Sequence, residues 1–249
     1  IIANLEQVNA WLGPFLKERE EVLITALPMY HVFALTINSL VFLRLGCDNL
    51  LVTNPRNIGE FLEILSHYKP SVMTGVNTLF NAMMNHPDFQ QVDWSQMKMS
   101  VGGAMALQRA VVEEWQKQTD SKLIEGYGLT EASPVVTVNP LDATDRIGTI
   151  GLPLPSTEVK LVTEDGAEVT EANQPGELWV KGPQVMRGYW NRPEESANVL
   201  MENGEWLRTG DIAEWRGDGF LAIVDRLKDM INVSGFNVYP NEVEDALAS

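Results

Sequence analysis

Several features are scarce in this sequence, and each scarcity argues against a class of protein. The 249 residues include a single cysteine, Cys47, so no internal disulfide can form, which is typical of a reducing compartment. Basic residues are outnumbered, with 18 Lys and Arg against 34 Asp and Glu, and the formal net charge is −16. That balance argues against a nucleic-acid-binding surface and against a purely electrostatic membrane anchor.

Long hydrophobic runs are missing as well. The longest apolar stretch, residues 29–45, is interrupted by His31, Asn38, Ser39 and Arg44. It is too short and too polar to span a bilayer, so a buried helix is predicted there. The N-terminus lacks the basic-then-apolar order of a signal peptide. We therefore expect a cytoplasmic protein, and peripheral association with the inner face of the membrane stays open.

The first 150 residues alternate between amphipathic segments and short apolar runs. Apolar side chains at helical spacing predict helices over residues 1–18, 58–68, 78–85 and 107–117. Short apolar runs predict buried strands over residues 22–26, 50–52, 72–74, 98–101 and 122–124. Alternating strands and helices are typical of βα units, so we expect an α/β fold with a largely parallel sheet.

After Ile150 the pattern changes. We interpret residues 151–155, which contain Gly151 and two prolines, as a linker. Short alternating strands are predicted over residues 158–162, 177–181 and 220–224. They indicate a small β-barrel-like unit, which divides the chain into an α/β subdomain (1–150), a β-barrel-like subdomain (151–224) and a hinge with the start of a further domain (225–249).

One glycine-rich motif, Glu125-Gly126-Tyr127-Gly128-Leu129-Thr130-Glu131, lies between two apolar runs. We expect it on a loop at the carboxyl end of a strand, where open α/β sheets bind ligands. The two glycines allow close approach of the backbone, the tyrosine offers a flat ring, and Glu131 is a hard oxygen ligand suited to Mg²⁺. The motif predicts a nucleotide site, with an ordinary glycine-rich turn as the alternative.

Three other segments allow two interpretations each. Val101-Gly102-Gly103-Ala104 follows a predicted strand, and its small residues suit either a ligand or close helix packing. Thr209-Gly210-Asp211 places a carboxylate after a predicted glycine turn, where it could bind ribose hydroxyls or simply cap the turn. His31 taken alone is more typical of a packed histidine than of a catalyst.

Together with the glycine-rich motif, four further segments carry a resemblance: LPMYH (27–31), WLRTGD (206–211), DRLKDMI (225–231) and VSGFNVYP (233–240). In this order they resemble the adenylate-forming, or AMP-binding, superfamily, and within it the bacterial long-chain fatty-acid–CoA ligases. The likeness covers nearly the whole chain. It implies the second half of the large N-terminal domain of such an enzyme, followed by a small β-barrel-like unit.

The resemblance also implies a reaction. A long-chain fatty acid is activated by ATP to an acyl-adenylate, and CoA then displaces AMP to form the thioester, with Mg²⁺ as cofactor. Two parts of the family are absent from the sequence, the phosphate-binding loop with its lysine and most of the C-terminal domain with a second lysine. We therefore expect an internal fragment that is inactive by itself. The alternatives are a ligase for aryl, acetyl or medium-chain acids, or a non-catalytic nucleotide- or acyl-binding protein.

The same resemblance implies roles for individual residues. The nucleotide is expected to contact Gly103, Ala104, Glu125, Gly126, Tyr127, Gly128, Thr130, Asp211 and Arg226. The acyl pocket is expected to include His31, Phe33, Val101 and Gly102. The reacting centre is expected to involve Thr130, Glu131 as the metal ligand, and His31 in positioning rather than as a base. Lys228 is expected to act as a hinge, and Ser234 and Gly235 are expected to border CoA.

Overall fold

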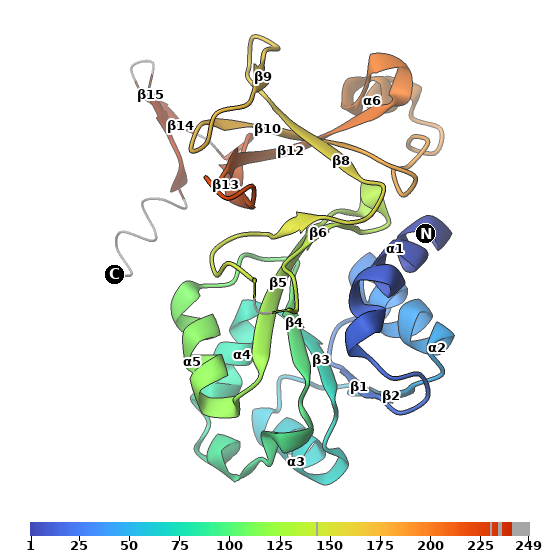
Figure 1. Ribbon diagram of the computed structural model, residues 1–249, viewed down its shortest axis with the longest axis vertical. Helices are drawn as coiled ribbons and strands as arrows, with labels where there is room; N and C mark the ends of the chain where they lie inside the picture. Colours follow the sequence, from blue (N-terminus) through green and yellow to red (C-terminus); the bar gives the residue numbers. More distant parts are fainter. Residues whose placement is uncertain (143, 230, 234–235, 241–249) are drawn as a thin grey trace.

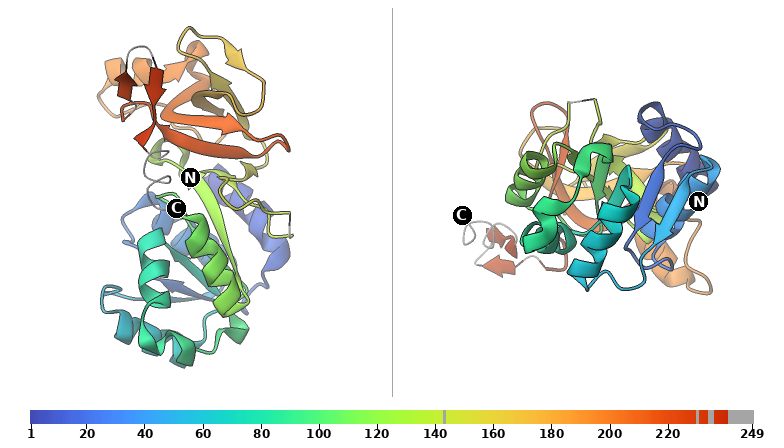
Figure 2. Two further views of the ribbon diagram at one scale, coloured as in Figure 1. Left: turned by 90° about the vertical axis from the view of Figure 1, so that its left-hand side faces the viewer. Right: turned by 90° about the horizontal axis from the view of Figure 1, so that it is seen from below.

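The protein folds into two parts, each built around one β-sheet, that lie one above the other along the long axis of the molecule (Figure 1). The structure is a computed structural model, and it describes residues 1–142, 144–229, 231–233 and 236–240. The left-hand view of Figure 2 shows the same division from the side. None of the helices in these residues is both long and apolar enough to cross a membrane.

The first part contains a seven-stranded sheet. In spatial order its strands are β2 (Asp48–Leu51), β1 (Val22–Thr25), β3 (Val72–Gly75), β4 (Met99–Gly102), β5 (Lys122–Gly128), β6 (Val135–Val138) and β7 (Leu152–Pro153). The strands from β2 to β5 are parallel, and β6 and β7 run antiparallel to their neighbours. The predicted α/β fold with a largely parallel sheet is confirmed.

Helices cover both faces of this sheet, which is why its central strands are nearly continuous apolar runs. One face carries α3 (Ile58–Tyr68), α4 (Asn77–Met84) and α5 (Arg109–Thr119), packed around the fully buried Trp115 (Figure 1). The other face carries α1 (Ile2–Leu12), the π-helix η2 (Ala34–Val41) and α2 (Phe42–Arg44). Short 3₁₀ helices complete this part: η1 (Gly13–Phe15), η3 (Pro87–Gln91), η4 (Trp94–Gln96) and η5 (Thr130–Ala132).

The helix predicted over residues 29–45 begins only at Val32, and much of it is a π-helix. Asn38, fully buried in η2, donates hydrogen bonds to the hydroxyls of Thr25 (2.9 Å) and Thr74 (2.7 Å) on the sheet. A buried amide needs such partners, so these bonds attach the wide helix to β1 and β3. Hydrophobic spacing alone does not distinguish a π-helix from an α-helix, because both bury one side.

The second part is a six-stranded antiparallel sheet. Its strands follow the order β11 (Leu200–Met201), β12 (Trp206–Trp215), β10 (Pro175–Lys181), β8 (Glu158–Val162) and β9 (Glu168–Val169), and β13 (Leu221–Arg226) pairs with β12. Between Gly151 and Trp190, where every residue is described, the chain forms no helix. Beyond that range come α6 (Pro193–Val199), η6 (Glu202–Gly204) and a hairpin of β14 (Ile231–Val233) and β15 (Phe236–Val238).

The interpretation of residues 151–155 as a linker is wrong. Leu152 and Pro153 form β7 and pair with β6, so the first sheet continues through this stretch. Gly151 also forms a bridge to Leu221 of the second sheet, whose N–H donates to the Gly151 carbonyl at 3.2 Å. Gly151 has φ +84°, and a Cβ there would lie 2.2 Å from backbone atoms of Val138 and Asn139. A glycine is therefore needed at this position because two chain segments pack closely there, and not because the chain is a flexible linker.

Candidate functional site

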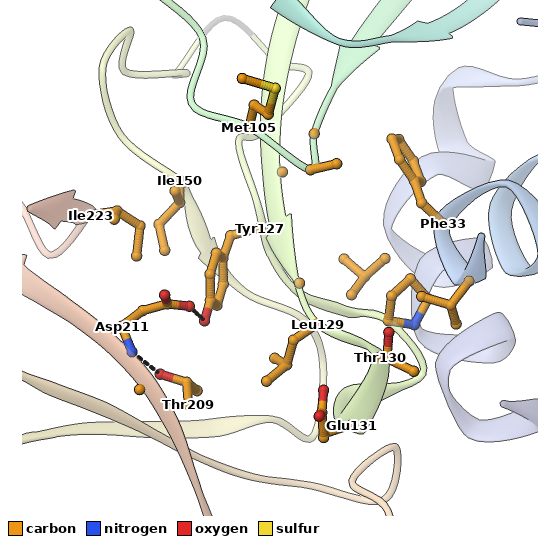
Figure 3. A pocket seen from close by; sticks show the side chains of 18 of the residues that line it. Phe33, Met105, Tyr127, Leu129, Thr130, Glu131, Ile150, Thr209, Asp211 and Ile223 are labelled. Carbon is orange, nitrogen blue, oxygen red and sulfur yellow. Dashed lines mark hydrogen bonds between the residues drawn. The ribbon is translucent and has the colours of Figure 1, made fainter. Parts of the chain in front are cut away.

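A cavity of about 980 Å³ lies between the two sheets and is lined by residues from both. On the first sheet its lining comes from the segments that follow β1 and β4 and from the end of β5, so the cavity opens at the carboxyl ends of parallel strands. Figure 3 shows Tyr127, Asp211, Phe33 and Glu131 around it. This edge is where open α/β sheets place ligands.

The sequence indicated that the glycine-rich motif lies on a loop, but only part of it does. Its first four residues, Glu125 to Gly128, are the end of β5 and pair with β6. The strand continues because β6 returns beside it and offers a hydrogen-bonding partner. Gly128 makes this possible, since a Cβ there would lie 2.2 Å from the carbonyl oxygen of Pro134. Only residues 129–131 leave the strand, and they carry Thr130 and Glu131 to the cavity wall.

The segment Thr209-Gly210-Asp211 is a β-bulge in the middle of β12, not a turn. Glu177 pairs with Ile212 and Trp179 with Arg208, so Leu178 of β10 alone faces the three residues. Gly210 supports this with φ +75°, a conformation that other residues rarely adopt. The bulge re-aims the chain so that Asp211 faces the cavity.

Tyr127 and Asp211 connect the two sheets across the cavity (Figure 3). The Tyr127 hydroxyl donates to Asp211 Oδ2 at 2.5 Å, and Arg226 Nε lies 3.7 Å from Asp211 Oδ1. Burial, with the neighbouring Asp211 charge, holds the pKa of Tyr127 well above its usual value, so the phenol stays a donor. Burial also raises the pKa of Asp211, against the lowering effect of the Tyr127 bond and of Arg226. Ile150 and Ile223 lie next to each other on one side of this pair and provide apolar contact area.

Glu131 lies at another edge of the cavity, held by Tyr189. The Tyr189 hydroxyl donates to Glu131 Oε1 at 2.7 Å, and burial together with this bond raises the pKa of Tyr189 to about 12. The backbone carbonyl of Glu131 accepts from the N–H of Met186 at 2.7 Å. The carboxylate is therefore fixed by the segment that follows β10, although its own place in the sequence is next to β5.

Mg²⁺ fits this arrangement as a substrate-associated ion rather than as a metal caged by the protein. Among the described residues, no group of three or more His, Cys, Asp and Glu side chains could hold a metal. Magnesium is usually bound by one or two carboxylates together with substrate phosphates and water. Glu131, a single carboxylate on the cavity wall, matches that donor set.

Glu125 is the other acidic residue of the motif, and its environment differs. Its Oε1 accepts a hydrogen bond from the N–H of Leu107 at 3.2 Å. Burial raises the pKa of the Glu125 carboxyl to about 7, despite the lowering effect of the Leu107 bond. Near neutral pH this group can therefore take up or release a proton inside the cavity.

The other end of the cavity is apolar. Val8 and Leu12 of α1, Ile37 of η2, Val101 of β4 and Val138 of β6 line it. Phe33 projects toward the same region from the start of the helix (Figure 3).

His31 lies at the exposed rim of this apolar end. Its Nδ1 accepts from the N–H of Phe33 at 3.2 Å, which fixes the ring. An imidazole held by its own backbone suits positioning better than proton transfer through Nδ1.

All of the site residues expected from the sequence that the structure describes line this one cavity, whereas Ser234 and Gly235 lie outside the described residues. Sequence reasoning missed Glu177, Tyr189, Ile150 and Ile223, which also line it. Glu177 shares one face of the strand with Trp179 and Lys181, and these polar or large residues alternate with Leu178 and Val180. The pattern is therefore typical of a solvent-facing strand residue. The only available signal for Tyr189 is an aromatic pair after a glycine, which is too common to be informative.

The model of the AMP-binding enzyme family matches residues 1–190. The chain belongs to the AMP-binding enzyme family. Two curated relatives are the long-chain-fatty-acid–CoA ligases of Escherichia coli O6:H1, 57 % identical over 247 residues, and of Bacillus subtilis, 40 % identical over 247 residues. Each match covers 99 % of this chain, but the chain spans only 44 % and 43 % of those proteins.

Solved structures of adenylate-forming enzymes share the fold. The anthranilate CoA ligase AuaEII, in complex with anthranoyl-AMP, superposes with a TM-score of 0.87 at 29 % identity and covers 98 % of this chain. ATP-bound MatB from Rhodopseudomonas palustris gives 0.86 at 28 % identity and covers 99 %. This chain corresponds to 46 % and 47 % of those two chains. The expected fold, part of the large domain of an adenylate-forming enzyme, is therefore confirmed.

Proposed function

We propose that this chain is part of an AMP-forming long-chain fatty-acid–CoA ligase. The observation that carries the proposal is the single cavity with two chemically different ends. Tyr127, Asp211 and Arg226 form a polar end, and Glu131 lies at another edge. Val8, Leu12 and Ile37 belong to an apolar end. A substrate that joins a nucleotide to a hydrocarbon chain needs both. The 57 % identity to a ligase of that name supports the choice of acid.

The polar end would bind the nucleotide. Tyr127 would stack on the adenine, with Ile150 and Ile223 as apolar neighbours, and Asp211 and Arg226 would hold the ribose hydroxyls. Gly103, Ala104, Gly126 and Gly128 would bring backbone close to the base and phosphates, as expected for small residues at strand ends. Glu125, whose pKa lies near 7, would border the base as well.

The reacting centre would lie between the two ends. The fatty-acid carboxylate attacks the α-phosphorus of ATP and pyrophosphate leaves, which forms the acyl-adenylate. The CoA thiol then attacks the acyl carbon, loses its proton and displaces AMP. Thr130 would contact the phosphate and Glu131 would hold Mg²⁺, which neutralises phosphate charge when bound.

The remaining assignments concern the acyl pocket and the hinge. His31, Phe33, Val101 and Gly102 would border the acyl chain near its carboxylate. Lys228, in the turn after β13, would be the pivot of a hinge between the half-reactions. The α/β and β-barrel-like divisions would meet near residue 153, where the first sheet ends, and the third would follow β13.

The test is a substrate panel on the full-length protein that contains this chain. Pyrophosphate release and thioester formation would be measured with ATP, Mg²⁺ and CoA, using palmitate, octanoate, acetate, benzoate and 4-coumarate in turn. We expect the highest kcat/KM with the long-chain acid. A preference for the aromatic acids would instead favour an aryl-CoA ligase, which the 32 % identity to a 4-coumarate–CoA ligase-like protein makes the natural alternative. Nucleotide binding without turnover of any acid would indicate a binding protein.

A further inference from the structure

One buried carboxylate of the cavity wall has no place in the mechanism above. Glu177 lies on β10, opposite the β12 bulge, and only 8 % of its surface is exposed. A carboxylate can be buried this far only when its oxygens receive hydrogen bonds or charge partners. What surrounds Glu177 therefore indicates what the residue is for.

Three donors converge on the Glu177 carboxylate. Arg208 Nε donates to Oε2 at 2.9 Å, Trp179 Nε1 donates to the same oxygen at 3.0 Å, and the backbone N–H of Gly210 donates to Oε1 at 3.3 Å. The Arg208 guanidinium also lies 5.9 Å from the centre of the Trp179 ring, and the Lys160 ammonium lies 5.0 Å from the same centre. The two donors on Oε2 fix the carboxylate, and Oε1 is left directed at the bulge.

The hydrogen bond to the Gly210 N–H matters because of the position of Gly210 in the bulge. Gly210 is the positive-φ residue of the bulge and directly precedes Asp211, which faces the cavity. The Thr209 hydroxyl donates to the Leu178 carbonyl at 2.7 Å, and the N–H of Leu227 donates to the Gly210 carbonyl at 2.8 Å. These contacts provide partners for the Thr209 hydroxyl and the Gly210 carbonyl. The Gly210 N–H finds its partner in Glu177.

We propose that Glu177 is a positioning residue for ribose recognition. By holding the Gly210 N–H, it sets the direction in which the Asp211 carboxylate points. The inference rests on the proposed function, because it takes Asp211 to be the group that binds the ribose hydroxyls. A displacement of about 1 Å at a substrate-positioning group can weaken turnover roughly a hundredfold, so a fixed bulge matters. A purely structural ion pair between Glu177 and Arg208 is the competing explanation.

The deciding measurement is discrimination between ribose and deoxyribose. In the full-length enzyme, kcat/KM would be compared for ATP and for 2′-deoxy-ATP with the same fatty acid, in the parent and in Glu177→Gln. Glutamine keeps the shape but loses the charge and one acceptor. Losing a hydrogen bond to a charged group typically reduces binding about tenfold or more, so we expect the ATP preference to fall by about that factor. KM for the fatty acid should stay unchanged.

Two further variants separate positioning from folding. Glu158→Gln on the neighbouring strand β8 is the matched control, because its carboxylate is 67 % exposed and its nearest cation, Lys181, is 4.0 Å away. Trp179→Phe keeps an aromatic ring and removes one donor to Glu177. Should Glu177→Gln fail to fold, Trp179→Phe still tests the idea, with a smaller fall in the ATP preference and no change in Glu158→Gln.

The outcomes are distinct. If ATP and 2′-deoxy-ATP lose activity by the same factor in Glu177→Gln and Trp179→Phe, the pair with Arg208 is structural and the positioning role is overturned. If the parent binds ATP but does not prefer it to 2′-deoxy-ATP, the positioning role is overturned too. If the parent enzyme binds no ATP, the proposed function fails and the positioning role fails with it. Asp211→Asn marks the full loss of discrimination, and ATP binding by the parent distinguishes failure of the positioning role from failure of the proposed function.

Discussion

The two sheets bring functional groups to the same cavity in different ways. The parallel sheet does so at its edge, where β1, β4 and β5 end and the chain turns through small residues. The antiparallel sheet contributes Asp211 from the middle of β12, where a bulge interrupts the ladder. The first mode uses free backbone groups at strand ends, and the second re-aims one side chain from an otherwise regular strand.

The difference shows in what each glycine does. At the end of β5, Gly128 is required by contact, because a Cβ would meet the Pro134 carbonyl oxygen at 2.2 Å. In the β12 bulge, Gly210 is favoured by backbone conformation alone, since no atom lies within 4 Å of its would-be Cβ. At these two positions, packing requires the glycine beside the parallel strands and dihedral angles favour it in the antiparallel sheet. Four experiments on the full-length protein would test how far this contrast extends.

The largest effect is expected for Glu131→Gln, on the parallel side. If Glu131 holds the metal at the phosphates, loss of that contact should slow pyrophosphate release about 10³-fold, or roughly 4 kcal/mol, by analogy with other transition-state charge contacts. The matched control is Glu113→Gln, an exposed carboxylate on α5 outside the cavity. Full pyrophosphate release by Glu131→Gln would show that the metal assignment is wrong.

The glycine contrast itself is tested by a pair of alanine substitutions. Gly128→Ala should lower the free energy of unfolding by about 3 kcal/mol or more, because backbone atoms must move apart. Gly210→Ala should lower it by only about 1 kcal/mol, the cost of a left-handed backbone for a residue with a Cβ. Urea unfolding of both variants measures the difference. Equal losses would mean that packing constrains both sheets alike.

Glu125 allows the parallel side to be tested through pH. Its pKa is raised from 4.5 to about 7, so the folded state holds the proton more tightly than the unfolded chain does. The stabilisation this gives is complete below pH 4.5 and is lost as the pH rises through 7; a shift of that size corresponds to roughly 3 kcal/mol.

Glu125→Gln, which resembles the protonated acid, should therefore gain stability relative to the parent between pH 5 and pH 8.5. The melting temperatures of the two proteins at these pH values measure it. Glu168→Gln, an exposed carboxylate on β9, is the control and should show no such trend. A stability difference between Glu125→Gln and the parent that does not change with pH would contradict the raised pKa.

The smallest effect is expected for Tyr127→Phe, which cuts the connection between the two sheets. The variant keeps the ring for stacking and loses the 2.5 Å bond to Asp211. A single hydrogen bond of this kind contributes about 1 kcal/mol net, so AMP affinity measured by calorimetry should fall about fivefold. Unchanged affinity would mean that Arg226 alone is enough to orient Asp211.

The helices and strands of the first part followed from local patterns. α3 begins and ends at the predicted residues, Ile58 and Tyr68, and the buried strands matched apolar runs. Local signals were less informative wherever two distant segments pair. The extension of β5 through Gly128 depends on β6. β7 also depends on β6, and its paired residues are 14 positions apart for Val138 and Leu152 and 16 for Thr137 and Pro153.

The sequence by itself determined the α/β class, the family resemblance and the residue types around the cavity, because periodicity and short motifs are local properties of the chain. Tertiary structure alone decided that Thr209-Gly210-Asp211 is a bulge, that Tyr189 holds Glu131 and that Glu177 is buried beneath Arg208. Each of these depends on contacts between residues 29 to 58 positions apart. Hydrophobic spacing along one strand carries no information about which charge will lie across from it, since pairing between strands is set only when the whole sheet assembles.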